Sequence, residues 1–329
     1  MRMSSIMPKL PFGKVLPLIA VAAMLGAALR PAAAQDWPTR PITIVVAFPA
    51  GGSLDFVARA IAHNLTDVFG QPVVVKNEAG GGGAIASTSV ARAAPDGYTL
   101  LVSAIGPMVF RPLMDKTSGY DADKDFTPII QAADGPNVIL ANPKLGFNTV
   151  KDLLAYAGKQ QNKISIAHPG PGTMGHLCAL LFAKETHVDG NLIAYRGAPP
   201  MIVDLLGGQI DIGVPSYGPG SDSVKILAVT SDKRVNFLPE VPTLKESGIN
   251  VVCSTWIAVY APPNLPTTIA AKLNAAIDAF LRKPETAEKF SRIGLHALGG
   301  TIEQLRQRAA SDRAKWSPII STINFNPAK

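Results

Sequence analysis

The chain has 329 residues, of which 47% are hydrophobic and 17% charged, so it has enough apolar material for a large core and too little charge for a disordered protein. The formal net charge of +7 is unevenly distributed, because residues 1–34 contain four basic and no acidic residues, whereas the rest has 27 basic against 24 acidic. That remainder contains no dense cluster of Lys or Arg, so the composition argues against a nucleic-acid-binding protein.

The N-terminal segment has the three-part pattern of a secretory signal peptide. Three basic residues precede an apolar run over residues 15–29, and three alanines ending at Ala34 fit the cleavage motif. The apolar run is shorter than the roughly 20 residues that a membrane-spanning helix needs, and the segment has no Cys for a lipid anchor. We therefore predict a signal peptide over 1–34, cleaved after Ala34, and a soluble mature protein in the periplasm.

The first half of the mature chain alternates between predicted strands and helices. Apolar runs predict strands, and apolar residues at helical spacing predict helices between them. The strands are expected at 42–48, 72–76 and 98–104, and the helices at 53–69 and 84–94. This order predicts parallel strands with right-handed crossovers in an α/β architecture.

The same alternation restarts in the second half and ends in helices. Strands are expected at 138–141, 164–167, 192–195, 210–214 and 226–230. Helices are expected between them, after Thr149 and at 176–184 and 200–206. An extended segment at 251–260 is followed by helices at 267–282, 285–293 and from Thr301 on. The last helices have no strands of their own, so they must pack on the first sheet. We therefore predict two lobes, 35–134 plus 255–329 and 135–254, joined by two linkers with a cleft between them.

The two cysteines, Cys178 and Cys253, lie in apolar runs without the CxxC spacing of a redox or zinc site. An oxidising compartment permits a disulfide, but a buried free Cys also behaves as a small hydrophobic residue. We expect two free thiols. A disulfide between them stays open as the alternative, because the sequence does not supply the Cα distance that a bridge requires.

Two glycine-rich loops follow predicted strands of the first lobe, at Ala50–Ser53 and Gly80–Gly83. In an open parallel sheet, ligands bind at the carboxyl ends of the strands. Glycines let the backbone approach a ligand closely, and free N–H groups at a helix start favour an anion. The alternative is a tight turn, with Ser53 and Asp55 as ordinary helix-capping residues. Because two such loops occur together, we favour a site for one carboxylate.

The second lobe has a similar strand–loop–helix segment around Thr173. His168, Thr173 and His176 could each donate to a ligand oxygen, and Arg196 could pair with a second carboxylate. The alternatives are packed histidines and a solvated arginine. Asp211 is expected to make a structural hydrogen bond.

Catalytic and cofactor signatures are absent from the sequence. There is no nucleophile elbow, zinc-protease helix or phosphate-binding loop with its Lys, and the histidines lack metal-ligand spacing. Residues 81–86 match the loose dinucleotide fingerprint, but no acid ends the next strand. We expect no enzyme, no cofactor and no metal. The alternative is an exported α/β hydrolase or dinucleotide-dependent enzyme.

The chain resembles the receptors of tripartite tricarboxylate transporters, the Bug-type periplasmic solute-binding proteins. The resemblance rests on WPTRPITIVVAFPAGGSLDFVARAIA, GQPVVVKNEAGGGGAIA, APDGYTLLVSA, GPGTMGH, AYRGAPPMIVDLLGGQID and LPEVPTLKESG, and extends over nearly the whole mature chain. It implies a type II, Venus-flytrap periplasmic binding protein, with a mostly parallel sheet flanked by helices in each lobe. Such a receptor, expected here to be a monomer, delivers a small organic carboxylate to the permease subunits of its transporter.

The resemblance also implies where the ligand lies. In this family the loops matching Ala50–Ser53 and Gly80–Gly83 hold a carboxylate through main-chain groups and waters, and segments matching Thr173, His176 and Tyr195–Gly197 line the opposite lobe. The full set of expected ligand-binding residues is Phe48, Ala50, Gly51, Gly52, Ser53, Asp55, Gly80, Gly81, Gly82, Gly83, Ser103, His168, Gly172, Thr173, His176, Tyr195, Arg196 and Gly197.

The sequence departs from the family pattern at positions that would face the far end of the ligand. Glu78 and Ala79 replace the usual Arg-Pro before the second glycine loop, and His168-Pro169 replaces a pair of small residues. Pro215 lies where the family often has an acid, which argues against an amino-acid ammonium group. The choice among dicarboxylate, hydroxy acid and aromatic acid stays open.

Overall fold

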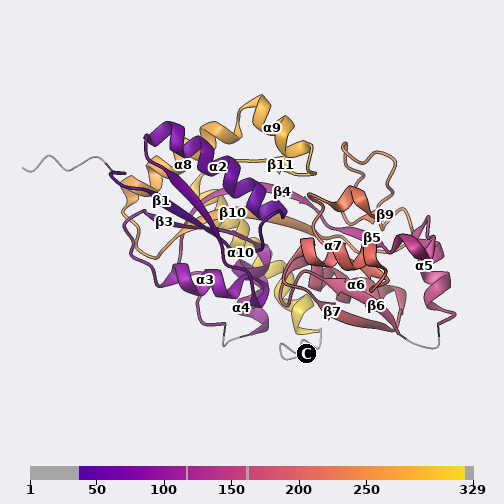
Figure 1. Ribbon diagram of the computed structural model, residues 1–329. Coiled ribbons are helices and arrows are strands. Elements are labelled where there is room, and N and C mark those ends of the chain that lie inside the picture. Colours follow the sequence, from indigo (N-terminus) through magenta and orange to yellow (C-terminus); the bar gives the residue numbers. More distant parts are fainter. Residues whose placement is uncertain (1–36, 116–117, 161–162, 323–329) are drawn as a thin grey trace, which may run out of the picture. The chain divides into compact units, whose positions relative to one another are not determined.

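The computed structural model describes residues 37–115, 118–160 and 163–322 (Figure 1), so the predicted signal peptide lies outside the described residues. Both sheets belong to one compact unit, Arg40–Lys329, which does not include Met1–Thr39. Within the described ranges, none of the helices is long and apolar enough to cross a bilayer.

The first sheet, as far as the chain is described, has six strands in the order β11-β4-β10-β3-β1-β2. Their bounds are β1 Ile42–Val46, β2 Val73–Asn77, β3 Thr99–Ala104, β4 Thr127–Pro136, β10 Ser254–Ala261 and β11 His296–Ala297. Strand β1 pairs in parallel with β2 and β3, as the βαβαβ pattern predicts. Strand β10 pairs antiparallel with both β3 and β4, so the sheet is mixed.

Helices from both ends of the chain pack around this sheet. They are α2 Ser53–Phe69, η1 Gly81–Gly83, α3 Ala84–Ala91, η2 Gly106–Phe110, α4 Arg111–Met114, α8 Thr267–Leu281, α9 Pro284–Ser291 and α10 Ile302–Ser321. Helices α8 and α10 contact β4, so the C-terminal helices return to the first sheet as expected. The indole of Trp256 on β10 donates to Asp312 of α10 over 2.8 Å, and the Phe110 and Trp316 rings meet edge to face.

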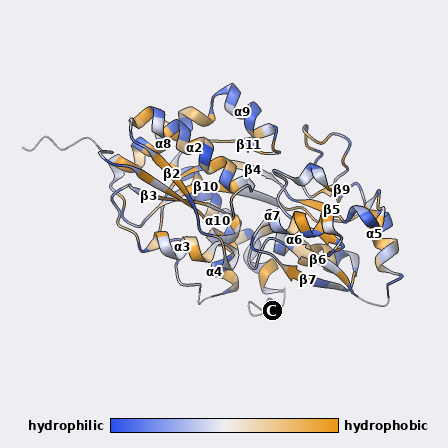
Figure 2. Ribbon diagram, in the orientation of Figure 1, coloured by the Kyte–Doolittle hydropathy of each residue, from blue (hydrophilic) through white to orange (hydrophobic). Residues whose placement is uncertain are grey.

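The second sheet, among the described residues, has five strands in the order β7-β6-β8-β5-β9. Its elements are β5 Val138–Ala141, η3 Pro143–Leu145, α5 Val150–Ala157, β6 Ile164–His168, α6 Met174–Thr186, β7 Gly190–Ala194, α7 Ala198–Gly207, β8 Ile212–Gly213, η4 Ser221–Ser223 and β9 Lys225–Val229. A capping box of Thr149 and Asp152 begins α5, and Asp211 accepts hydrogen bonds from Ser165, both as predicted. Figure 2 shows hydrophobic colour along the strands and hydrophilic turns on α5 and α9.

The two sheets with flanking helices confirm the two-lobe α/β architecture. Each sheet is mixed, where mostly parallel sheets were expected. The reason is that the segments connecting the sheets enter antiparallel to their neighbours: β10 lies antiparallel between β3 and β4, and β5 lies antiparallel between β8 and β9.

Two chain segments lead from one sheet into the other and lie side by side. Strand β4 continues through Asn137 into β5, and the chain returns through Cys253 into β10. Thr230 joins the two segments: its N–H donates to the Asn137 carbonyl, and the Cys253 N–H donates to the Thr230 carbonyl. The predicted boundaries at 134/135 and 254/255 lie beside these segments and stay predictions.

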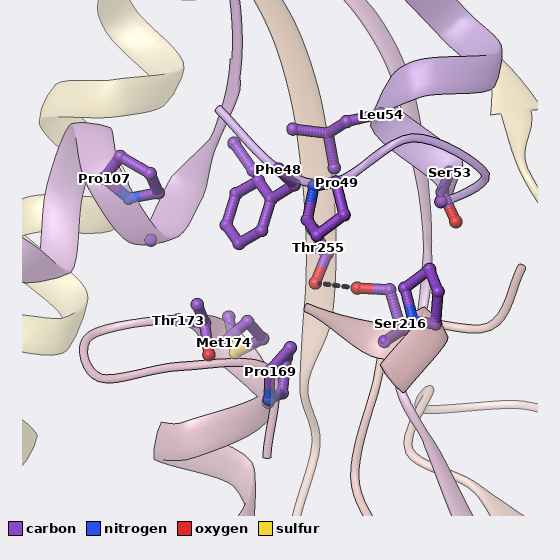
Figure 3. A pocket seen from close by; sticks show the side chains of 16 residues that line it. Phe48, Pro49, Ser53, Leu54, Pro107, Pro169, Thr173, Met174, Ser216 and Thr255 are labelled. Carbon is purple, nitrogen blue, oxygen red and sulfur yellow. Dashed lines mark hydrogen bonds between the residues drawn. The ribbon is translucent and has the colours of Figure 1, made fainter. Parts of the chain in front are cut away.

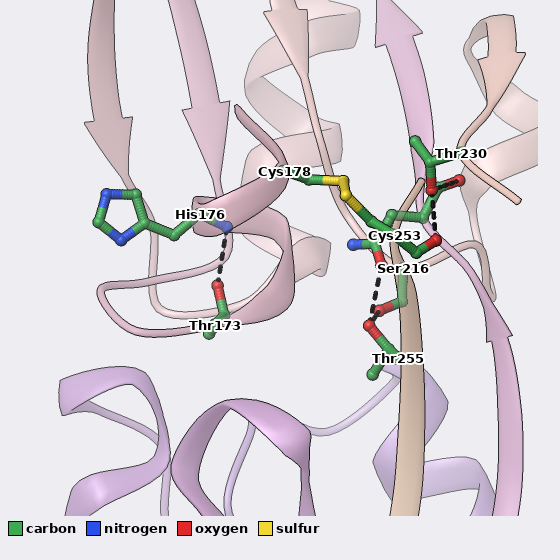
Figure 4. The surroundings of a disulfide bond; sticks show 8 residues. Thr173, His176, Cys178, Ser216, Thr230, Cys253 and Thr255 are labelled. Carbon is green, nitrogen blue, oxygen red and sulfur yellow. Dashed lines mark hydrogen bonds between the residues drawn. A yellow bond between two sulfur atoms is a disulfide. The ribbon is translucent and has the colours of Figure 1, made fainter. Parts of the chain in front are cut away.

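A disulfide joins Cys178 of α6 to Cys253, with 6.2 Å between their Cα atoms (Figure 4). The expectation of two free thiols is therefore wrong. Both cysteines are buried in apolar surroundings, as their sequence context suggested. The fold brings together two residues that are 75 positions apart.

Candidate functional site

A cavity of about 60 Å³ lies between elements of the two sheets (Figure 3). We call it the apolar cavity, and it is lined by Phe48, Pro49, Gly52, Ser53, Leu54, Ala104, Gly106, Pro107, Pro169, Thr173, Met174, Gly175, Ala198, Pro199, Ser216 and Thr255. Most of the lining residues follow the carboxyl ends of β1, β3 and β6 or begin the helices after them, which is where an open α/β sheet binds ligands. Ala198 and Pro199 begin α7, Ser216 follows β8, and Thr255 lies at the start of β10.

Main-chain N–H groups at helix starts supply the hydrogen-bond donors of the apolar cavity. Gly52 is the N-cap of α2, and Thr173 is the N-cap of α6. The N–H groups of Ser53, Leu54 and Met174 donate to none of the described residues. Such N–H groups, together with the positive ends of the helix dipoles, favour an anion.

A chain of hydroxyl hydrogen bonds forms another wall of the apolar cavity. The Ser216 hydroxyl donates to Thr255 Oγ1 over 2.8 Å, as Figure 3 shows, and the Thr255 hydroxyl donates to Asn137 Oδ1 over 2.9 Å. Asn137 lies in the first segment between the sheets and Thr255 in the second. This wall is therefore built from both segments that connect the sheets and from Ser216, which follows β8 and pairs with Asn137.

A second hollow of about 140 Å³ adjoins the apolar cavity and shares Phe48 and Pro169 with it. We call it the arginine pocket; its lining consists of Phe48, Gly80, Gly81, Gly82, Gly83, Pro169, Pro171, Ala194, Tyr195 and Arg196. Arg196 is exposed, and its guanidinium makes no hydrogen bond or ion pair with the described residues. The Tyr195 hydroxyl donates to Asp204 over 2.6 Å, and burial with this contact raises the pKa of Tyr195 to about 12.

The loops of the two lobes touch backbone to backbone. A Cβ built on Gly82 would lie 1.9 Å from the carbonyl oxygen of Pro171, and one on Gly106 would lie 2.8 Å from that of Gly172. Arg111 supports the first contact, because its guanidinium donates to the Gly81 carbonyl over 3.1 Å. Only glycine leaves room for these approaches, so the described conformation is a closed one at this point.

Two histidines lie stacked behind the loop that leads into α6. The His168 and His176 rings have centroids 4.1 Å apart, and their Nδ1 atoms accept hydrogen bonds from the N–H groups of Gly170 and Gly172. Burial lowers the pKa of His168 to about 4, and burial together with the neighbouring His168 lowers that of His176 to about 3. Both rings are therefore neutral at pH 7 and hold the loop in place.

Of the two expected capping residues of α2, only Asp55 acts on the loop. Burial raises the pKa of Asp55, but hydrogen bonds from Arg59, Gly51 and Asn77 outweigh it, and the net pKa lies below its ordinary value. Ser53 does not cap the helix: its hydroxyl donates to the carbonyl of Tyr217 over 3.2 Å. That oxygen belongs to a segment 164 positions away, which local spacing cannot reveal.

The structure distributes the expected site residues over several places. Phe48, Gly52, Ser53 and Thr173 line the apolar cavity, whereas Phe48, Gly80–Gly83, Tyr195 and Arg196 line the arginine pocket. The two glycine loops thus lie on neighbouring hollows rather than around one point.

The other expected residues do not line either hollow. Ala50 and Gly51 are exposed in the loop before α2. Gly172 faces Arg111, and Gly197 faces the ring of Pro49. Ser103 is fully buried, with a hydroxyl that has no partner among the described residues.

Sequence reasoning missed most of the apolar lining. Gly106 and Pro107 follow the third predicted strand, so the rule that ligands bind at strand ends could have found them. Met174 is the first residue of α6 and was within reach of the same rule. No sequence signal marks Ser216 and Thr255, which reach the apolar cavity only through the tertiary fold.

The arrangement is suited to binding rather than to bond breaking. The side chains that line the apolar cavity include hydroxyls but no His, Cys, Lys or carboxylate that could serve as their base. Among the described residues, no group of three His, Cys, Asp or Glu could hold a metal ion.

Comparison with known proteins gives one consistent result. The profile of the family described as tripartite tricarboxylate transporter family receptor matches residues 57–325. Protein BugT of Bordetella pertussis is 33% identical over 314 residues, which cover 93% of this chain and 96% of BugT.

Two solved structures are similar over nearly the full length of their chains. The structure of R. palustris Rpa4515 with adipate has a TM-score of 0.84 and 34% identity, and covers 87% of this chain and 98% of its own. The structure of the periplasmic binding protein BugD has a TM-score of 0.82 and 34% identity, with the same coverage of 87% and 98%.

Proposed function

The chain belongs to the family of tripartite tricarboxylate transporter receptors, and we propose that it captures a small carboxylate between its lobes and delivers it to the membrane subunits of a transporter of that type. It is a periplasmic solute-binding receptor and not an enzyme, since its family and its structural relatives are binding proteins. The observation that supports a carboxylate ligand is the set of free main-chain N–H groups at the starts of α2 and α6, which lie around one cavity.

The donors of this site suit an anion without an ion pair. A hydrogen bond to a charged group contributes about 1.5–3 kcal/mol net, so two or three such bonds can hold a small acid. Adipate in the structure of Rpa4515 supports the same ligand class for this chain. We expect the mature receptor to begin at Gln35, to be a monomer and to need no cofactor.

We propose that the ligand holds the lobes together. The free energy of closure must come from selective affinity for the closed state. The glycine contacts of Gly82 with Pro171 and of Gly106 with Gly172 support a closed state in which the two loops meet.

Uptake measurements test the transport function directly. Cells that express the transporter's membrane subunits should accumulate a labelled acid only when this receptor is also exported. N-terminal sequencing of the exported protein should begin at Gln35. Uptake that is equal without the receptor would contradict the delivery function, and retention of Met1 would contradict the cleavage.

A further inference from the structure

The lining of the apolar cavity indicates which kind of carboxylate fits the site, in addition to the general class of the ligand. Figure 3 shows Phe48, Pro49 and Leu54 on one side of the cavity and Pro169 and Met174 on the opposite side. Phe48 and the prolines present rigid apolar faces. Together with Pro107 and Pro199, they leave only main-chain groups and four hydroxyls as polar lining.

No cation reaches this space from the described residues. Arg111 is bonded to Asp115 and to the Gly81 carbonyl, and Arg59 is bonded to Asp55. None of these five residues lines the apolar cavity. Arg196 lies in the neighbouring arginine pocket and is exposed.

The hydroxyl wall is also unsuited to a second carboxylate. The Ser216 and Thr255 hydroxyls are hydrogen-bonded to each other and to Asn137, so the wall is partnered within itself and carries no positive charge. It can exchange a hydrogen bond with a ligand hydroxyl, but it does not balance the charge of a second carboxylate.

Burying an ionised group without a partner costs several kcal/mol. The free N–H groups of Ser53, Leu54 and Met174 offset the cost of burying one carboxylate. No group on the apolar side of the cavity offsets the cost of burying a second one. Burial of a methyl or methylene group there is favourable by about 0.8 kcal/mol.

We infer that this receptor selects monocarboxylates with a short apolar body over dicarboxylates of the same carbon chain. The inference rests on the proposed function and narrows its ligand. Phe48, Leu54 and Met174 are the side chains that set the preference. Because a cavity of about 60 Å³ holds only a few water-sized groups, the shortest acids should distinguish monocarboxylates from dicarboxylates most clearly.

Matched acids test the inference by calorimetric titration of the full mature protein, stripped of bound ligand by unfolding and refolding with the disulfide intact. Butyrate and succinate share a four-carbon chain, as hexanoate and adipate share six carbons, and differ only in the terminal group. We expect the monocarboxylate of each pair to bind at least tenfold more tightly.

A charge placed in the cavity should reverse this order. In Met174→Lys, the ratio of the affinity for succinate to the affinity for butyrate should rise at least tenfold relative to the unchanged protein. Met174→Leu should keep the original preference for butyrate. Leu54→Lys provides a second test if Met174→Lys does not give a cooperative melting transition.

The outcomes separate this inference from the proposed function. A dicarboxylate that binds as tightly as its monocarboxylate partner overturns the inference and leaves the carboxylate receptor intact. Failure of all four acids to bind also overturns the inference, whereas the proposed function falls only if uptake of a carboxylate is equal without the receptor.

Discussion

Gly82 is the position at which a single added methyl group should most affect ligand binding. Its φ is +63°, and a Cβ there would lie 1.9 Å from the carbonyl oxygen of Pro171, whereas real Cβ contacts essentially never fall under 3.0 Å. In Gly82→Ala the two loops must therefore separate by at least about 1.1 Å. Because the opposing atom is backbone, rotation of a side chain cannot relieve the clash.

The substitution has two costs, and a matched control separates them. A residue with a Cβ in the left-handed region costs roughly 1–2 kcal/mol of stability. Gly146 has a φ of +68° with nothing within 4 Å, so Gly146→Ala carries this strain alone. We expect Gly146→Ala to bind normally and Gly82→Ala to bind at least tenfold more weakly, about 1.4 kcal/mol or more.

Calorimetric titration with butyrate and adipate measures the effect, and small-angle scattering of the saturated protein shows whether the lobes still close. Gly106→Ala is an independent test, because its Cβ would lie 2.8 Å from the Gly172 carbonyl without a positive φ. Should both Gly82→Ala and Gly106→Ala bind within twofold of the unchanged protein, the contact between these loops is not part of the ligand-bound state.

Two further predictions concern stability. Reduction of the bond between Cys178 and Cys253, which are 75 positions apart, should lower the free energy of unfolding by about 2–4 kcal/mol. The double Ser variant should lack this response, and an unchanged denaturation midpoint on reduction of the native protein would contradict it. The pKa values of His168 and His176, about 4 and about 3, lie below the ordinary 6.5, so the unfolded chain takes up protons first as the pH falls. The stability from these neutral rings is present above pH 6.5 and is lost toward pH 4, with a loss of about 4 kcal/mol between pH 8 and pH 5. His168→Asn should remove about half of this pH dependence; a flat pH profile in denaturant titrations would refute the assignment.

Local sequence predicted much of the secondary structure of this protein, but it missed strand β4 at Thr127–Pro136 and the helical segments η2 and α4. The apolar run of β1, the capping boxes at Thr149 and Thr301 and the stop at Gly70 act over a few residues, so the pattern alone predicts them. The alternation of strands and helices also predicted the α/β class. No strand was predicted among the helices after residue 260, which predicted their return to the first sheet; the structure adds the two-residue strand β11 there, paired with β4.

Local spacing predicted contacts poorly where the partner was distant in the chain. Ser53 was expected to cap α2, but its hydroxyl donates to Tyr217. Gly52, with a φ of −89°, has a conformation open to any residue, and it is Gly51, with a φ of +81°, that requires glycine in this loop. The backbone angle depends on how the loop packs, which composition does not reveal.

The tertiary structure alone decided which strand ends meet and what surrounds the ligand. The glycine loops were predicted from their composition, yet only the fold assigns them to two neighbouring hollows. Ser216 follows β8 in the second lobe and Thr255 begins β10, and Cys178 meets Cys253 across 75 positions, because long-range pairing of the two lobes brings these residues together. Sequence encodes the donors for an anion within single loops, whereas the apolar surroundings that would choose among acids arise from several segments and exist only once both lobes are folded.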